Sequence, residues 1–186
     1  MTVGVLALQG DYDAHSRCLQ ELGASVALVR QPGQLDDVSA LVIPGGESSV
    51  LLKLLGRDQF WEKLQVFVHN KPCFGTCAGA ILLASEVENP EQSCLGAMDI
   101  RIQRNAYGRQ MQSAIHQVDT VLGGDPMEMV FIRAPRVTRV GAKVEILASH
   151  QGDPVWLRQG EIMVATFHPE LSKDRRVHAE FLRGMG

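Results

Sequence analysis

The sequence predicts an α/β fold with a mostly parallel central sheet that carries an antiparallel extension. Short apolar runs alternate with amphipathic segments through the first half of the chain, which is the pattern of successive βαβ units. The second half instead holds short strand-like segments separated by Gly and Pro, a pattern typical of antiparallel pairing. The length of 186 residues suits one compact domain, 1–186, and we find no repeat or linker that would divide it.

The first half begins with a mostly apolar run at 3–8, which ends at Gln9-Gly10 and predicts a strand buried on both faces. The amphipathic segment that follows stops at Gly23, a suitable residue for a helix C-terminus. Pro44 ends the apolar run 41–43 in the same way that Gln9-Gly10 ends the first one. By these signals we expect strands at 3–8, 26–29, 41–43 and 72–75, and helices at 12–22, 48–55 and 59–69.

The second half predicts an antiparallel extension of the same sheet, followed by a final helix at roughly 173–184. The strand-like segments are 98–104, 113–118, 129–132, 137–140, 144–149, 154–158 and 161–166.

Composition excludes several classes of protein. A net charge of −3 and an aromatic content of 5% argue against a general nucleic-acid binder or a base-stacking surface. The N-terminus has no basic region before its first apolar run, and no uncharged stretch is long enough to span a bilayer. The four cysteines form no CxxC pair, so we expect reduced thiols in a cytoplasmic protein.

The segment 75–79 (GTCAG) has the form of a nucleophile elbow, with Cys77 between two glycines, after an apolar strand and before an apolar helix. Glycines permit the sharp turn, and the first turn of the helix would favour a thiolate. The amide of Ala78 would point to where an oxyanion forms. The competing interpretation is a small-residue turn with a buried thiol.

The segment 166–170 (TFHPE) places His168 at the end of a predicted strand, with Glu170 two residues later. An extended i, i+2 spacing puts both side chains on one side of the chain, where the carboxylate fixes the imidazole tautomer. Alone, this motif is more often a surface turn. Together with Cys77 it predicts a Cys-His-Glu triad.

The segment 44–49 (PGGESS) also follows a buried strand, so its amides should lie at the same edge of the sheet. Gly45 and Gly46 can expose amides for an oxyanion hole, and Ser48 is a good N-cap for the next helix. No GK[ST] or GxGxxG motif accompanies these glycines, so a nucleotide site is not indicated. The alternative is a plain turn.

Isolated charged residues and histidines carry weaker signals. Arg101, Arg104 and Arg109 suit a solvated charged face, whereas Arg133 follows an apolar strand and could hold a carboxylate. We interpret His15 as a satisfied helix histidine. The other histidines lack metal-ligand spacing, so we predict no metal site; they are His69, His116, His150 and His178.

Taken together, these motifs resemble the triad-type (class I) glutamine amidotransferases, and within them the glutaminase subunits of pyridoxal 5′-phosphate synthases. The resemblance covers nearly the whole chain, and RNAYGRQ and FIRAP are its most family-specific parts. It rests on the segments 4–10, 44–48, 74–79, 104–110, 131–135 and 166–171.

The resemblance implies a flavodoxin-like three-layer fold and the hydrolysis of L-glutamine to glutamate and ammonia, with no cofactor. It also implies that a (β/α)8-barrel synthase subunit receives the ammonia within a large hetero-oligomer. By position, Cys77 is the nucleophile, His168 the acid–base and Glu170 its orienting partner. The implied glutamine-binding residues are Gly46, Glu47, Ser48, Arg104, Ile132 and Arg133.

Three alternatives remain open at this stage: a glutaminase subunit of another pathway such as histidine biosynthesis, a Cys-elbow peptidase or deglycase, and a non-catalytic regulatory module. One position departs from the family pattern, because Ala14 stands where the family often has Glu before the histidine of the first helix. This departure concerns the contact with the partner rather than the chemistry.

Overall fold

A seven-stranded sheet forms the centre of the computed structural model, which describes residues 1–106 and 113–185. Its order is β10 (Glu145–His150), β11 (Asp153–Gln159), β12 (Ile162–Ala165), β4 (Cys73–Thr76), β3 (Ala40–Ile43), β1 (Thr2–Leu6) and β2 (Ser25–Val29). Pairing is parallel from β12 to β2 and antiparallel from β10 to β12. The mostly parallel sheet with an antiparallel extension is therefore confirmed.

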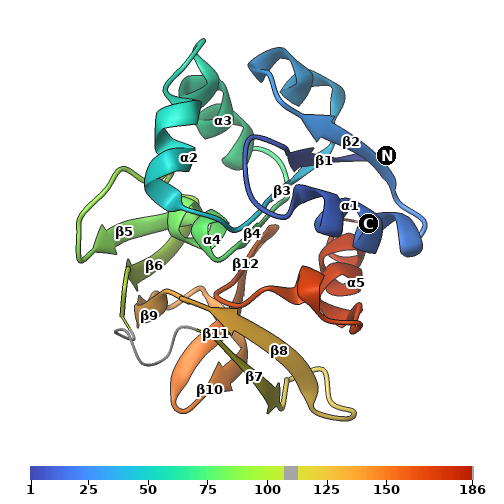
Figure 1. Ribbon diagram of the computed structural model, residues 1–186, viewed down its shortest axis with the longest axis vertical. Helices are drawn as coiled ribbons and strands as arrows, with labels where there is room; N and C mark the ends of the chain where they lie inside the picture. The colour runs from blue at the N-terminus through green and yellow to red at the C-terminus, as the bar shows by residue number, and fades with distance from the viewer. Residues whose placement is uncertain (107–112, 186) are drawn as a thin grey trace.

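Helices cover both faces of this sheet, as Figure 1 shows. On one face lie α2 (Ser48–Leu55), α3 (Phe60–Val68) and α4 (Ala78–Leu83); on the other lie α1 (Tyr12–Glu21) and α5 (Arg176–Arg183). Each face has its own apolar core. Leu51 and Leu64 belong to the first core, and Leu19 and Phe181 belong to the second. Because β1, β3, β4 and β12 are mostly apolar, they bury side chains in both cores, which gives the predicted three-layer arrangement.

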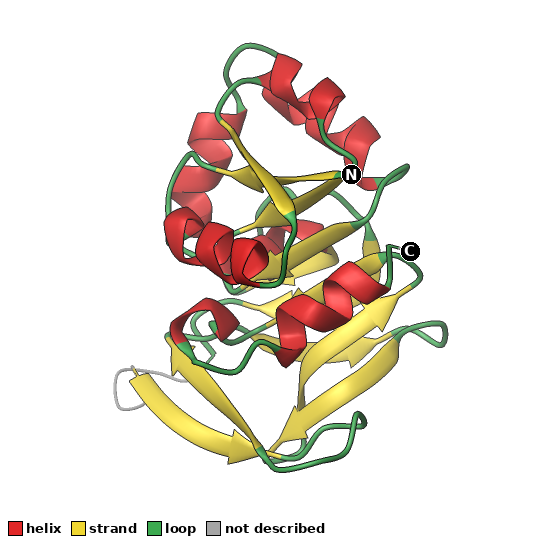
Figure 2. Cartoon of the chain, turned by 90° about the vertical axis from the view of Figure 1, so that its right-hand side faces the viewer, coloured by secondary structure: helices red, strands yellow, loops and turns green. Residues whose placement is uncertain are grey.

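The second half differs from expectation in one respect. Among the strands described after residue 84, only β10, β11 and β12 extend the central sheet. A separate sheet contains β5 (Ala84–Glu88), β6 (Met98–Gln103) and β9 (Arg136–Val140), and β7 (Ser113–Val118) pairs with β8 (Met127–Ile132) in a hairpin. Figure 2 shows that the lower end of the molecule is built of strands and loops, whereas the helices lie in its upper and middle parts. A period-two pattern identifies a strand but not the sheet it joins, so the sequence could not separate these groups.

The predicted helices agree closely with the structure in the first half, and the last helix begins at Arg176 rather than near 173. Two short 3₁₀ segments, Pro32–Asp37 and Pro169–Leu171, were not predicted. None of the helices in the described part of the chain has both the length and the apolar character needed to cross a lipid bilayer.

The parallel strands β1, β3, β4 and β12 all end at the same edge of the sheet. Their carboxyl ends bring together four segments that are distant in sequence, and ligands of open α/β sheets bind at this edge. The segments are 9–11, 44–47, 76–78 and 166–170.

Candidate active site

Cys77 occupies a strained turn between β4 and α4, with φ 48° and ψ −104°. This region is costly for a residue with a Cβ atom, and such strain persists only where the surroundings impose it. The Cys77 amide donates to the Ala165 carbonyl at 2.9 Å, which ties the turn to the end of β12. The elbow geometry expected of 75–79 is therefore present.

Two glycines allow the turn to approach its neighbours. A Cβ atom on Gly79 would lie 2.0 Å from the Ile43 carbonyl oxygen, and one on Gly75 would lie 2.5 Å from the Gly79 backbone. Both contacts are with main-chain atoms, which cannot move aside as a flexible side chain would.

We therefore expect Gly79→Ala to lower the free energy of unfolding by about 3 kcal/mol and the Tm by roughly 6–12 °C. Gly33→Ala is the matched control, because a Cβ there meets nothing within 4 Å and its φ is not in the left-handed region. Thermal and urea unfolding of the two variants will measure the difference. Equal Tm values for them would contradict the close approach of α4 to β3.

His168 and Glu170 lie together at the end of β12. Nδ1 of His168 is 2.7 Å from Oε1 of Glu170, and the two residues are each 6% exposed. The His168 amide donates to the Val130 carbonyl of β8 at 2.8 Å, which fixes this segment against the hairpin. With Nδ1–H directed at Glu170, Nε2 is the ring nitrogen left to interact with the Cys77 side chain, which lines the same cleft.

The surroundings of the His168 imidazole favour its charged form. Burial opposes the imidazolium, but hydrogen bonds and charge from Cys77 and Glu170 outweigh it and raise the pKa of His168 to about 10. Burial likewise opposes the Glu170 carboxylate, and the imidazoles of His15 and His168 outweigh it and lower the pKa of Glu170. This balance suits a histidine that must hold a proton taken from a thiol.

The glycine loop lies directly against the cysteine and histidine. A Cβ atom on Gly45 would be 2.6 Å from Cε1 of His168 and 3.2 Å from Cβ of Cys77. Gly46 has φ +124°, and the next residue is held by Gln9, which accepts from the Glu47 amide at 3.2 Å and donates to its carbonyl at 3.1 Å. Ala78 is the first residue of α4, where main-chain amides lack partners within the helix. Gly45, Gly46 and Ala78 thus lie beside Cys77, and their role as oxyanion donors stays a prediction.

A cleft of about 240 Å³ opens over Cys77 and His168. All six residues predicted to bind glutamine line it: Gly46, Glu47, Ser48, Arg104, Ile132 and Arg133. Arg104 Nη2 lies 3.7 Å from Glu47 Oε1, so the two charges face each other within the cleft. Glu170 lies behind His168 and does not line it.

The cap of α2 differs from the prediction. Glu47, not Ser48, is the N-cap residue, and its carboxylate accepts from the Ser49 amide at 3.1 Å and the Ser49 hydroxyl at 2.7 Å. Ser48 instead donates to Oε1 of Gln92 at 2.9 Å. The longer side chain of Glu47 reaches the amide of Ser49, the second residue of the helix. Ser48 is therefore not needed as the cap, and it lines the cleft instead.

Two of the three arginines first assigned to a charged face lie in the described part of the chain, and they differ in their environment. Arg101 pairs with Glu86 at 2.6 Å on the outer surface, as predicted, whereas Arg104 turns into the cleft. Arg109 lies outside the described residues. Arg133 lines the cleft with φ 44°, and Asn105, which the sequence analysis did not single out, lines it with φ 53°.

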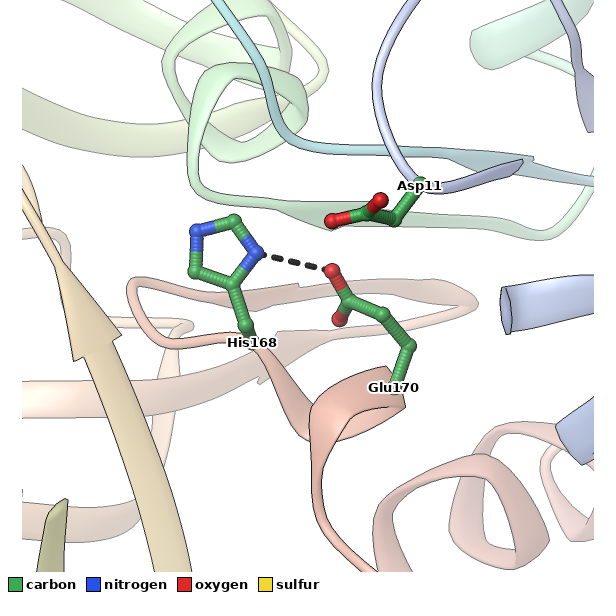
Figure 3. A group of neighbouring side chains, drawn as sticks. All are labelled: Asp11, His168 and Glu170. Carbon is green, nitrogen blue, oxygen red and sulfur yellow. Dashed lines mark hydrogen bonds and ion pairs between the residues drawn. The ribbon is translucent and has the colours of Figure 1, made fainter. Parts of the chain in front are cut away.

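Asp11 is a second residue that the sequence analysis missed. It follows β1, and Figure 3 shows its carboxylate pointing toward the His168–Glu170 pair. Ligand atoms of these three residues lie within 4.8 Å of one another, a spacing that suits a metal ion. However, Nδ1 of His168 carries the proton that bonds Glu170, so its lone pair is not free for a metal. We therefore interpret Asp11 as an acidic wall of the cleft.

His15 is a satisfied helix histidine, as predicted, and its partners lie far from it in the sequence. It is fully buried on α1, and its Nε2 lies 3.2 Å from Oε2 of Glu170. Its Nδ1 is 2.9 Å from Nε2 of His178 on α5, a pair that no local spacing in the sequence could reveal.

Comparison with known proteins agrees with this geometry. The family model described as "SNO glutamine amidotransferase family" matches residues 5–185. A protein of Koribacter versatilis is 60% identical over 183 residues, covering 98% of this chain and 95% of its own length. One of Solibacter usitatus is 48% identical over 186 residues, covering 97% of each. Both are named "Pyridoxal 5′-phosphate synthase subunit PdxT".

A solved structure titled "Crystal structure of glutamine amidotransferase" superimposes with a TM-score of 0.90 at 42% identity, covering 99% of this chain and 98% of the other. The family model spans the parallel sheet, the Cys77 elbow and the His168–Glu170 pair alike. This chain belongs to the SNO glutamine amidotransferase family.

Proposed function

We propose that this chain is the glutaminase subunit of a pyridoxal 5′-phosphate synthase, hydrolysing L-glutamine to L-glutamate and ammonia. The observation that carries the proposal is the Cys77–His168–Glu170 arrangement at the base of a cleft lined by Arg104 and Arg133. The names of the two relatives support the pathway.

In the first half of the reaction, the Cys77 sulfur attacks the side-chain amide carbon of glutamine while Nε2 of His168 takes the thiol proton. The amides of Ala78 and of the Gly45–Gly46 loop hold the oxygen that becomes negatively charged. As the C–N bond breaks, His168 returns the proton to the nitrogen, and ammonia leaves a γ-glutamyl thioester on Cys77.

In the second half, His168 removes a proton from water, which attacks the thioester carbon. The C–S bond breaks, His168 returns the proton to the sulfur, and glutamate leaves. Glu170 keeps Nδ1–H directed away from the sulfur throughout, so that Nε2 alone exchanges protons.

We assign recognition of the glutamine α-carboxylate to the cationic side of the cleft. Arg104→Ala should raise KM for glutamine by about 10- to 100-fold with little change in kcat, because a contact equally present in ground and transition states affects binding alone. Arg101→Ala, on the same segment but paired outward with Glu86, is the control and should leave both constants unchanged. A fall in kcat with constant KM for Arg104→Ala would contradict this assignment.

The partner would be a (β/α)8-barrel synthase subunit in a large hetero-oligomer, and the complex would be cytoplasmic, consistent with four free cysteines. We also propose that residues 1–186 act as one glutaminase domain. Strand β12 from the second half pairs with β4 from the first, so both halves contribute to one sheet and to one site.

The test is formation of pyridoxal phosphate by this chain mixed with its synthase partner, with glutamine or an ammonium salt as nitrogen source. We expect glutamine to serve only when both chains are present and ammonium to serve the synthase alone. Exchange of the partner for the synthase subunit of histidine biosynthesis is the specificity control. Glutamine-dependent product with that subunit, or none with the pyridoxal phosphate partner, would overturn the proposed pathway.

A further inference from the structure

The carboxylate of Glu170 is shared between two imidazoles. Oε1 faces Nδ1 of His168 at 2.7 Å, and Oε2 lies 3.2 Å from Nε2 of His15. The side chains of His15 and Glu170 are both 0% exposed, so water does not reach Oε2. No aligned hydrogen bond reaches that oxygen from the described residues, which leaves the imidazole of His15 as its polar neighbour.

The protonation state of His15 follows from its surroundings. Complete burial lowers its pKa; Glu170 and Asp11 oppose this effect and His168 reinforces it. The pKa of His178 is lowered further, by burial, by His15 and by Arg175. Both rings are therefore neutral at pH 7, and each carries one ring proton.

The hydrogen-bond partners decide which nitrogen of His15 carries its proton. A proton on Nδ1 would leave a lone pair on Nε2 facing the Glu170 carboxylate, and would leave the proton of His178 on its unpartnered Nδ1. With protons on both Nε2 atoms, His178 donates to Nδ1 of His15, and Nε2–H of His15 lies between Oγ1 of Thr76 at 3.1 Å and Oε2 of Glu170. Only this arrangement avoids both a buried lone-pair clash and a buried N–H without an acceptor.

We propose that His15 is a positioning residue for the triad: its Nε2–H, which bonds Oγ1 of Thr76 and lies 3.2 Å from the second oxygen of Glu170, attracts that oxygen electrostatically, so that the first stays on Nδ1 of His168. This inference rests on the proposed triad and deepens it, because it adds His15 on α1 and His178 on α5 to the residues that position the triad. The role of His178 is to fix the tautomer of His15 through the 2.9 Å contact between their rings.

The consequence is measurable at the cysteine. A Glu170 carboxylate that is free to rotate stabilises the His168 imidazolium less well, and a weaker base takes the Cys77 proton less readily. Removing the His15 N–H should therefore shift the alkylation of Cys77 to higher pH without removing any group that touches the sulfur.

The experiment is the rate of Cys77 alkylation by iodoacetamide between pH 5 and 10, followed by mass spectrometry of the peptide containing Cys77. His15→Leu should move the half-maximal rate up by about one pH unit, which is about a tenfold loss of rate on the acidic side. His15→Gln keeps an N–H near the position of Nε2, so its pH profile should lie close to that of the wild-type protein. Because iodoacetamide requires neither glutamine nor the partner, the result stands whether or not the glutaminase proposal is correct.

Cys18→Ala is the matched control. Cys18 lies one turn along α1 from His15, and its sulfur is 3.9 Å from the main-chain oxygen of Glu170, so this variant loosens the same helix contact without affecting the carboxylate. We expect an unshifted profile. An unshifted profile for His15→Leu, or an equal shift in Cys18→Ala or His15→Gln, would overturn the proposal.

A second measurement covers the case in which His15→Leu fails to fold. Nitrogen-15 NMR of histidine-labelled wild-type protein should show His15 and His178 as neutral Nε2–H tautomers at pH 7. A cationic His15, or a proton on its Nδ1, would contradict the proposed arrangement directly.

Discussion

Cys77→Ala is expected to lower glutaminase activity by about 10⁴-fold or more, to the background of the assay. The variant removes the sulfur that forms the thioester, and no other thiol lies in the cleft among the described residues. Release of glutamate, measured with the synthase partner present, provides the readout. Glutamine-dependent formation of pyridoxal phosphate should vanish with it, whereas ammonium-dependent formation by the complex should persist.

The strain at Cys77 provides an internal control for this prediction. Both Cys77→Ala and Cys77→Gly lose the sulfur, but only the glycine variant escapes the cost of a Cβ atom at φ 48°. We expect Cys77→Gly to be more stable than Cys77→Ala by about 1 kcal/mol, after the entropic cost of glycine is subtracted. Activity remaining in either folded variant would show that Cys77 is not the nucleophile.

Glu170→Gln is expected to lower kcat by about 10²–10⁴-fold with the fold intact. An amide can present its NH₂ group to Nδ1 of His168, which selects the tautomer that cannot take the thiol proton. Loss of the carboxylate also lowers the pKa of His168 from about 10. The imidazolium that protonates the leaving ammonia then loses its proton at lower pH, so the alkaline limb of the residual activity should move down.

Glu180→Gln is the control for burial of a glutamate. Glu180 is 6% exposed and accepts from Arg158 at 2.7 Å, on α5 and outside the cleft. We expect this variant to lose stability but to keep kcat and its pH profile. A loss of activity in Glu180→Gln as large as in Glu170→Gln would mean that both act through stability alone.

Much of the site could be predicted from the sequence because its chemistry lies in short local motifs. The glycines around Cys77 signal a strained turn by residue type alone. The two-residue spacing of His168 and Glu170 predicts their contact, but the structure makes it through the 3₁₀ turn Pro169–Leu171 and not through the extended chain that we expected. Glu47 and Ser48 show the limit of such reasoning. The family resemblance assigned both to glutamine binding and both line the cleft, but which of them caps α2 depended on side-chain reach rather than on cap preference.

What the sequence determined by itself is the alternation of strands and helices, the elbow at Cys77 and the His168–Glu170 pair. Local periodicity and the backbone preferences of glycine and proline are sufficient for these. Only the tertiary structure decided that Arg104 turns inward while Arg101 turns outward, that β5–β9 leave the central sheet, and that His15 meets His178 behind Glu170. These outcomes depend on which surfaces of the folded chain pack together, and local residue patterns do not encode that packing. Burial then sets the protonation of the histidines.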